Sequence, residues 1–174
     1  AAAFANIDAI ISTITAIDGS DPVLDAHGGD LANFSGWSGY VSATSVYPDM
    51  AHDICYEDTE VAPATARGKA RVIAEAHWQE AFGTEIFRAA GIYGVGRSPF
   101  DALRDGTARI IEREGQVFNR IHVDDICRII IAAMAKPRLG RIINLADHKP
   151  APQGDVVRHA ADLIGIKPPT PQKL

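Results

Sequence analysis

The side chains best suited to acid–base chemistry lie in two segments of this sequence. Tyr93 stands in the glycine-rich stretch GIYGVGR (91–97), and His122 stands in NRIHVDDI (119–126). A phenol and an imidazole can each donate or accept a proton, and a histidine can change its charge near neutral pH. Arg97 can bind a phosphate or carboxylate through its forked guanidinium, and the glycines allow the backbone to approach a ligand closely. These segments predict a site for a small anionic ligand.

Arg120 and His122 are separated by one residue within an expected strand, so they should share one face of it. We interpret them as a pair that binds the anionic part of a substrate, with His122 as a candidate proton donor. Alternatives stay open for each position. His122 could make a structural hydrogen bond, Tyr93 could pack in the core, and the glycines of 91–97 could simply form turns.

Strand and helix patterns alternate along the chain, which predicts a parallel sheet covered by helices on both faces. Apolar β-branched runs indicate strands, and apolar residues recurring every three to four positions indicate helices. The expected strands are Ile7–Ile14, Gly39–Val46, Glu85–Ile92, Val117–Val123 and Ile142–Leu145. The expected helices run from Pro22 to Gly36, over Ala66–Phe82, over Ser98–Ile111, from Asp124 to Pro137 and over Gln153–Ile164. The proline-rich tail KPPTPQKL is expected to be irregular.

In such a sheet, ligands bind beyond the carboxyl ends of the strands. Ser12 and Thr13 end the first expected strand, and Thr44 and Ser45 lie at the end of the second. Because Thr44 and Ser45 should alternate across a strand end, one of them could face the ligand. An ordinary structural hydroxyl is the alternative at each of these positions.

The composition excludes several classes of function. The 174 residues are 47% hydrophobic and 22% charged with a formal net charge of -5, so we expect a single globular α/β unit. No long run of Lys and Arg indicates nucleic-acid binding, and no apolar run is long enough to span a bilayer. Cys55 and Cys127 lie far apart, and the histidines lack ligand spacing, so neither a disulfide nor a metal site is predicted. A small-molecule ligand in the cytoplasm fits best.

Four motifs together resemble the extended short-chain dehydrogenase/reductase family, in its NAD(P)-dependent epimerase/dehydratase-like branch. They are SATSVYP (42–48) with EDTEVAP (57–63) behind it, FRAAGIYGVGR (87–97), NRIHVDDI (119–126) and INLADHKPAP (143–152). Their order, spacing and strand context all match, and the similarity extends from about Ile7 to about Gly165. The resemblance implies a Rossmann-type, doubly wound and mostly parallel sheet that binds NAD or NADP.

The sequence most resembles the second part of such a protein. It contains no GxGxxG, so the usual helix N-terminus that holds the cofactor phosphates is missing. We therefore expect the chain to be a fragment of a longer protein that lacks the N-terminal GxGxxG half. Residues 1–97 would form the C-terminal half of a Rossmann-like domain, and residues 98–174 would supply substrate-side segments with the final strand and helices.

Three positions depart from the catalytic pattern of the family. Four residues before Tyr47, where the family has Ser or Thr, stands Ala43. The Tyr and Lys of its Tyr-x-x-x-Lys motif, counted back from Glu75, are replaced by Arg67 and Arg71. An arginine stays protonated, so Arg67 cannot exchange a proton as a tyrosine does. Arg71 could still hold a ribose hydroxyl or a phosphate; the alternative is a solvated helix face on which it pairs with Glu75.

The resemblance also implies roles for individual residues. The expected cofactor contacts are Ser12, Thr13, Thr44, Arg71, Ile92 and Tyr93, and the expected substrate contacts are Arg97, Arg120 and His122. The remaining candidates for catalysis are Tyr93, His122 and Thr44. The implied function is an NAD(P)-dependent oxidoreductase or epimerase for a small anionic or nucleotide-sugar-like substrate, forming a homodimer through helix 66–82. A catalytically silent NAD(P)-binding or regulatory module, or an incomplete domain, remains the alternative.

Overall fold

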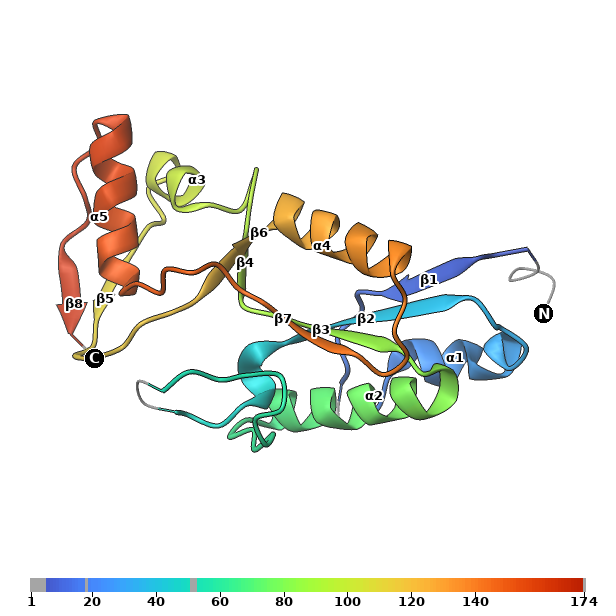
Figure 1. Cartoon of the computed structure of the whole chain (residues 1–174). Helices are drawn as coiled ribbons and strands as arrows, with labels where there is room; N and C mark the ends of the chain where they lie inside the picture. Colours follow the sequence, from blue (N-terminus) through green and yellow to red (C-terminus); the bar gives the residue numbers. More distant parts are fainter. Residues whose placement is uncertain (1–5, 18, 51–52, 174) are drawn as a thin grey trace. The chain divides into compact units, whose positions relative to one another are not determined.

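The computed structural model describes residues 6–17, 19–50 and 53–173, and its contacts group the chain into two compact units (Figure 1). The first unit combines the residues up to Ala89 with Cys127–Leu145. The second unit combines Ala90–Ile126 with the residues from Ala146 onward. Each unit is therefore assembled from two separate stretches of sequence. The expected roles of 1–97 and 98–174 in a larger domain stay a prediction.

Four parallel strands form the sheet of the first unit, in the order β1-β2-β3-β7. They are β1 (Ala9–Ser12), β2 (Trp37–Ala43), β3 (Glu85–Ala89) and β7 (Ile142–Leu145). The register places Ser12 beside Tyr40 and Ser42 beside Arg88. Because all four strands run in the same direction, their carboxyl ends lie along one edge of the sheet, where ligands bind in such folds.

Helices cover both faces of this sheet, as the α/β pattern predicts. In Figure 1, α1 (Pro22–Leu31) and α2 (Ala66–Phe82) lie on one face, and the part of α4 (Val123–Ala135) that belongs to this unit lies on the other. The ranges of α2 and β7 agree with the prediction residue by residue. Their apolar patterns are long or clear enough for local sequence to determine both ends.

The start of α1 follows from its sequence. The Asp21 carboxylate accepts hydrogen bonds from the backbone amides of Val23 and Leu24, both at 3.0 Å, and Pro22 occupies the first helical position. The indole Nε1 of Trp78 donates a third hydrogen bond, at 3.0 Å, to the same carboxylate. Asp21 thus fixes α1 against α2 while both of its oxygens are satisfied.

Aromatic side chains fill the core between the sheet and these two helices. Tyr40 stacks on Trp78 with ring centroids 6.1 Å apart and an interplanar angle of 19°, and the ring centroids of Trp78 and Phe82 are 5.6 Å apart. Burying each large apolar side chain contributes about 2–3 kcal/mol to stability. This cluster packs α2 against the sheet.

The second unit contains two small parallel sheets and two helices. The sheets pair β4 (Gly91–Tyr93) with β6 (Arg120–His122), and β5 (Ile110–Glu112) with β8 (Pro171–Lys173). The helices are α3 (Pro99–Arg104) and α5 (Gln153–Ile164). A compact apolar core is formed by Leu103, Ile110, Val157, Ala160 and Ala161. The predicted range of α5 is confirmed.

The single strand predicted over Glu85–Ile92 is wrong. The chain forms β3 up to Ala89, leaves the sheet of the first unit at Ala90, and continues as β4, which pairs with β6. One continuous apolar run therefore serves two sheets, because the hydrogen-bonding partner changes from β7 to β6. The strands predicted over Ile7–Ile14 and Val117–Val123 are present as β1 and β6, but both are shorter than predicted.

Two further predictions in the second unit are wrong. The helix expected over Ser98–Ile111 ends at Arg104, because the chain turns at Gly106 with a φ of 68° and then enters β5. The tail that we expected to be irregular forms β8, which pairs with β5. Strand pairing with a partner far away in sequence supplies the hydrogen bonds that proline-rich local sequence does not predict.

Candidate functional site

Ser12 and Thr13 lie at the carboxyl end of β1, where the sequence places a cofactor contact. Ser12 is 6% exposed, and its Oγ has no hydrogen-bond partner among the described residues. Thr13 follows it and is exposed to solvent. Ser12 therefore has an unused hydrogen-bonding group at the edge where a ligand would bind.

Thr44 and Ser45 do not alternate across a strand end, so the strand predicted over Gly39–Val46 is wrong in its last three residues. They belong to a single 3-10 turn, η2 (Thr44–Val46), closed by the Tyr47 amide donating to the Thr44 carbonyl at 3.1 Å. The close approach of α2 accounts for this turn. A Cβ on Gly68 would lie only 2.5 Å from the Ser45 carbonyl oxygen, so only glycine permits the contact. Thr44 is half-buried and Ser45 is exposed.

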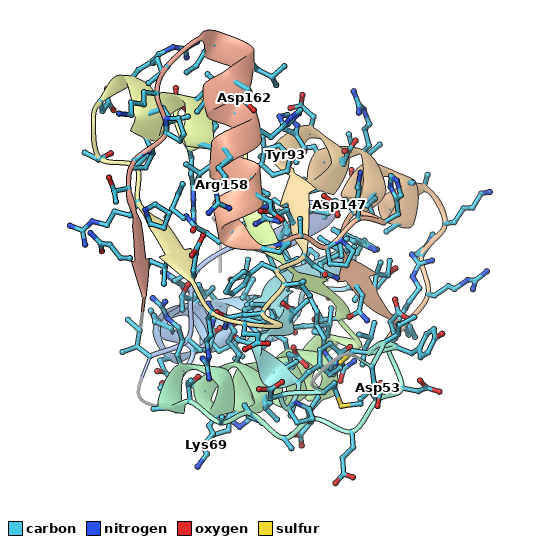
Figure 2. All side chains as sticks on the ribbon, turned by 90° about the vertical axis from the view of Figure 1, so that its left-hand side faces the viewer. Asp53, Lys69, Tyr93, Asp147, Arg158 and Asp162 are labelled. Atoms are coloured by element: carbon cyan, nitrogen blue, oxygen red, sulfur yellow. The ribbon has the colours of Figure 1, made fainter. Side chains whose placement is uncertain are left out.

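Arg71 extends from α2 to this turn. Its Nη1 donates a hydrogen bond to Ser45 Oγ at 3.3 Å, and no carboxylate among the described residues is within ion-pair distance of it. Burial lowers the pKa of Arg71, and the nearby charge of Arg67 lowers it further. Lys69, on the same helix, is exposed and points outward in Figure 2. Arg71 is thus a positive charge near the carboxyl ends of the strands without a carboxylate to neutralise it.

Glu75 forms its ion pair with Arg88, so the alternative in which Arg71 pairs with Glu75 along the helix is not found. Its carboxylate instead accepts hydrogen bonds from Arg88 Nη2 at 2.8 Å and from Nε at 3.2 Å, in a site where both residues are buried. Arg88 Nη1 donates to the Tyr47 hydroxyl at 2.8 Å, and that hydroxyl donates to Asn144 Oδ1 at 2.8 Å. We call Glu75, Arg88, Tyr47 and Asn144 the ion-pair network. Burial opposes the charge of Arg88, but the hydrogen bonds to Glu75 and Tyr47 raise its pKa overall.

Three buried hydroxyl groups lack partners: those of Ser12, Tyr40 and Ser42. They are the only buried side-chain polar atoms without a hydrogen bond in the described part of the chain, and we call them the hydroxyl cluster. Ser12 and Tyr40 are register neighbours, and Ser42 lies two residues beyond Tyr40 on the same face of β2, toward α2. Burial raises the pKa of Tyr40 to about 12 and the Asp21 charge adds to this, whereas the Arg71 charge and the nearby Ala16 backbone oppose it.

The sequence analysis missed Tyr40 and Ser42. A signal for them exists, because Ser38, Tyr40 and Ser42 place polar atoms at every second position of a strand that should be buried on both faces. Such a polar alternation indicates hydrogen bonding on one face. It does not indicate which of the three hydroxyls will have a partner. Ser38 has one, since its Oγ lies 2.8 Å from Thr84 Oγ1.

In the second unit the structure brings together Tyr93 and His122, two of the predicted catalytic residues. They are register neighbours in the β4–β6 pair, and their rings pack edge to face with centroids 5.1 Å apart and an interplanar angle of 76°. The position of Tyr93 is labelled in Figure 2. His122 Nδ1 accepts a hydrogen bond from the Asp124 amide at 3.2 Å and lies 3.6 Å from the Asp124 carboxylate. Ile92, an expected cofactor contact, precedes Tyr93 and is half-buried.

The two predicted substrate arginines differ. Arg120 Nη1 donates hydrogen bonds to the carbonyl oxygens of Phe118 at 2.9 Å and Ala151 at 3.4 Å, so much of its hydrogen-bonding capacity is used within its own unit. Arg97 is exposed, and no hydrogen bond or ion pair of its side chain is found among the described residues. Arg97 is therefore the more available of the two for an anionic ligand.

The glycines beside Arg97 fit the geometry of a tight turn. Gly94 and Arg97 exchange backbone hydrogen bonds at 3.2 and 3.1 Å, which closes a tight turn in which Gly96 has a φ of 76°. A Cβ on Gly94 would lie 2.7 Å from Val123 Cγ1. These contacts support the turn interpretation of GIYGVGR, and they give the exposed Arg97 a defined position at the end of the turn.

The described residues contain no group of three His, Cys, Asp or Glu side chains arranged as they would be around a metal ion. No helix over residues 6–17, 19–50 and 53–173 is both long enough and apolar enough to cross a membrane.

The sequence matches no family profile and no curated protein. Among solved structures, it is similar to a protein of unknown function from Silicibacter pomeroyi, with 39% identity and a TM-score of 0.93 over 98% of this chain and 62% of that one. It is also similar to a candidate NAD-dependent epimerase/dehydratase from Methylobacillus flagellatus, with 30% identity and a TM-score of 0.62 over 78% of this chain and 51% of that one. The chain thus spans less than two thirds of the length of each.

A more distant likeness is to the dTDP-glucose 4,6-dehydratase from Bacillus anthracis, whose structure contains NAD. The identity is 17% and the TM-score is 0.73, over 97% of this chain and 61% of that one. At this identity the match is evidence for the fold alone. Together with the parallel sheet and its two layers of helices, these likenesses identify the fold of the chain as the Rossmann-type α/β fold of NAD-dependent epimerases and dehydratases.

Proposed function

We propose that this chain belongs to an NAD(P)-dependent oxidoreductase of the epimerase/dehydratase type and contributes residues that bind the cofactor and a small anionic or nucleotide-sugar-like substrate. The similarity to the candidate epimerase/dehydratase from Methylobacillus flagellatus supports the class of enzyme. The observation that carries the cofactor proposal is the hydroxyl cluster, together with an Arg71 that lacks a carboxylate partner.

The residues present fit the sugar-phosphate part of a dinucleotide. Buried polar groups are normally hydrogen-bonded, so a group left without a partner points to a bound water, ion or ligand. Ser12 and Ser42 lie at or near the carboxyl ends of β1 and β2, the edge where this fold binds its ligands. Arg71 can donate to a ribose hydroxyl or to a phosphate, and Thr13 and Thr44 add hydroxyls at the same edge. Ile92 and Tyr93 are proposed to contact the nicotinamide side.

When bound, the nicotinamide ring supplies hydride transfer, which no side chain can perform. The chain has to supply the accompanying hydrogen bonds and proton transfers. Ala43 has no donor, and Arg67 stays protonated, so the usual Ser/Thr and Tyr functions are absent from those positions. We assign these hydrogen bonds and proton transfers to the pair of Tyr93 and His122, with Thr44 as a hydroxyl donor. Arg97, with Arg120 beside His122, would bind the negative charge of the substrate.

Titration of NADH and NADPH fluorescence with the purified chain tests the cofactor proposal. The variant Arg71→Met should weaken binding about tenfold, equivalent to ~1.4 kcal/mol, because it removes the α2 guanidinium that contacts the turn at the end of β2. Lys69→Met is the matched control. It removes a charge from an exposed position of the same helix and should leave the Kd unchanged. A folded wild-type chain that binds neither nucleotide would contradict the proposal.

A catalytically silent NAD(P)-binding or regulatory module is the second candidate. It is favoured by the replacement of all three usual catalytic positions by Ala43, Arg67 and Arg71. Incubation of the NADPH complex with a panel of carbonyl compounds separates the two candidates. Oxidation of NADPH supports the enzyme, whereas tight binding without oxidation supports the silent module.

We also propose that the protein forms a homodimer through α2 and functions in the cytoplasm. The outer face of α2 carries Ile73, whose side chain is 40% exposed, next to the small residue Ala76. The charges of Arg67 and Lys69 are confined to the first turn of the helix. Sedimentation analysis of Ile73→Glu should show a monomer if this face is the interface, and an unchanged dimer would place the interface elsewhere.

A further inference from the structure

His122 occupies the N-cap position of α4, immediately before the first helical residue, Val123. Side chains at this position commonly accept a hydrogen bond from the amide of the second or third helical residue, which has no partner inside the helix. The Nδ1 of His122 accepts such a bond from the Asp124 amide, at 3.2 Å. A nitrogen that accepts a hydrogen bond from N–H carries no proton, so the proton of the neutral ring is on Nε2.

The orientation of the ring is determined by its neighbours. Tyr93 of β4 packs edge to face against it, with centroids 5.1 Å apart. Titratable groups that face the imidazole within the described part of the chain include this phenol and the Asp124 carboxylate, 3.6 Å from Nδ1. The Asp124 side chain is 65% exposed, so solvent screens its charge. Main-chain and ring contacts therefore hold the imidazole more firmly than the carboxylate does.

The other ring nitrogen, Nε2, faces Gly94, which has no side chain. A Cβ on Gly94 would lie 3.8 Å from His122 Nε2 and only 2.7 Å from Val123 Cγ1, so a larger residue is excluded there. The His122 side chain remains 32% exposed. Nε2–H is thus left beside backbone, with access for a ligand.

We propose that His122 serves the proposed site as a neutral hydrogen-bond donor through Nε2–H, and not as a proton carrier. This inference rests on the proposed function. A neutral donor can bind and polarise a carbonyl or phosphate oxygen of the ligand. To accept a proton, the ring would have to take it at Nδ1 and give up the bond to the Asp124 amide. Proton transfer then falls to Tyr93, the other member of the pair, whose hydroxyl has no hydrogen bond among the described residues.

Long-range 1H–15N correlation spectra of the full chain, with 15N-labelled histidine at neutral pH, measure the tautomer directly. We expect Nδ1 of His122 to show the shift of an unprotonated nitrogen and Nε2 that of a protonated one. The exposed His148 should show the averaged shifts of a ring that exchanges between tautomers. A protonated Nδ1 in His122, or averaged shifts as in His148, would overturn the proposal.

Two variants test the capping bond independently. Asn is a good N-cap residue, so His122→Asn should keep the melting temperature of the wild type. His122→Leu offers no acceptor to the Asp124 amide and should melt about 2–4 °C lower. Equal melting temperatures for the Asn and Leu variants would also overturn the assignment. Neither measurement uses a nucleotide, so failure of this inference is distinguishable from failure of the proposed cofactor site.

Discussion

The first unit contains two neighbouring groups of mostly buried polar side chains: those of one group are hydrogen-bonded to each other, and those of the other are not. In the ion-pair network every charged or polar group has at least one partner within the unit. In the hydroxyl cluster none of the three hydroxyls has one. Ser42 and Arg88 are register neighbours, so the two groups adjoin each other on β2 and β3. The same environment thus holds polar groups that stabilise the fold and polar groups that remain available to a ligand.

The free-energy cost of burying a polar group without a partner explains this difference. A buried polar group without a partner costs about 1–3 kcal/mol, and a buried charge without a partner costs more. A fold can accept three unpaired hydroxyls near a binding edge if a ligand or water satisfies them in use. It cannot accept an unpaired Arg88. The two groups should therefore respond in opposite ways to the same kind of substitution.

The largest effect is expected for Glu75→Ala, which leaves the Arg88 guanidinium buried without its partner. We expect a loss of about 3–5 kcal/mol in the free energy of unfolding, measured by urea denaturation. Glu80→Ala, at an exposed position of the same helix, is the control and should change stability by about 0.5 kcal/mol or less. A similar, small loss for both variants would mean that the network does not stabilise the fold.

Tyr47→Phe should have the next largest effect. It removes the hydroxyl that accepts from Arg88 and donates to Asn144, both at 2.8 Å, while keeping the ring whose centroid lies 4.9 Å from Arg88 Cζ. Because the buried Arg88 and the half-buried Asn144 each lose a partner, we expect a loss of about 2 kcal/mol in urea denaturation. Unchanged stability would show that water replaces the hydroxyl in the network.

The pH dependence of stability should reveal the ionisation of the buried Tyr40 hydroxyl. Its pKa is raised by burial from 10 to about 12 in the folded chain, so the folded state holds this proton more tightly than the unfolded state does. The resulting stabilisation is complete below pH 10 and is lost as the pH rises toward 12. Tyr40→Phe should therefore reduce the fall in unfolding free energy over this range by on the order of 1 kcal/mol. Identical alkaline profiles for wild type and variant would exclude a buried Tyr40 hydroxyl.

At neutral pH, Tyr40→Phe should have the smallest effect on the free energy of unfolding. The sign of that effect is the most informative result. The Tyr40 hydroxyl is buried and makes no hydrogen bond of normal geometry, although the Ala16 backbone lies near it, so its removal should leave stability unchanged or increase it by up to about 1 kcal/mol. Tyr47→Phe is the matched comparison, because it makes the same chemical change in the satisfied group. A loss for Tyr40→Phe as large as that for Tyr47→Phe would indicate that an ordered water already satisfies the cluster.

Part of the site could be predicted from sequence. The edge of the sheet where ligands bind follows from the strand and helix order, and the residue types of Tyr93 and His122 indicate both as candidates for acid–base chemistry. Sequence did not reveal that Arg120 uses its guanidinium on the carbonyl oxygens of Phe118 and Ala151. A guanidinium can bind a ligand or a backbone equally well, and only the surrounding fold determines which one it meets.

Elements whose signal is local were determined by the sequence itself. Asp21 and Pro22 mark the start of α1, and the apolar repeats of Ala66–Phe82 and Gln153–Ile164 mark both ends of α2 and α5, because capping and helical periodicity act within a few residues. Only the tertiary structure decided the break at Ala90, the pairing of β5 with β8, the choice of Arg88 as the partner of Glu75 and the unpaired state of the hydroxyl cluster. These depend on contacts between residues far apart in the chain, and the sequence of either partner alone does not specify the other.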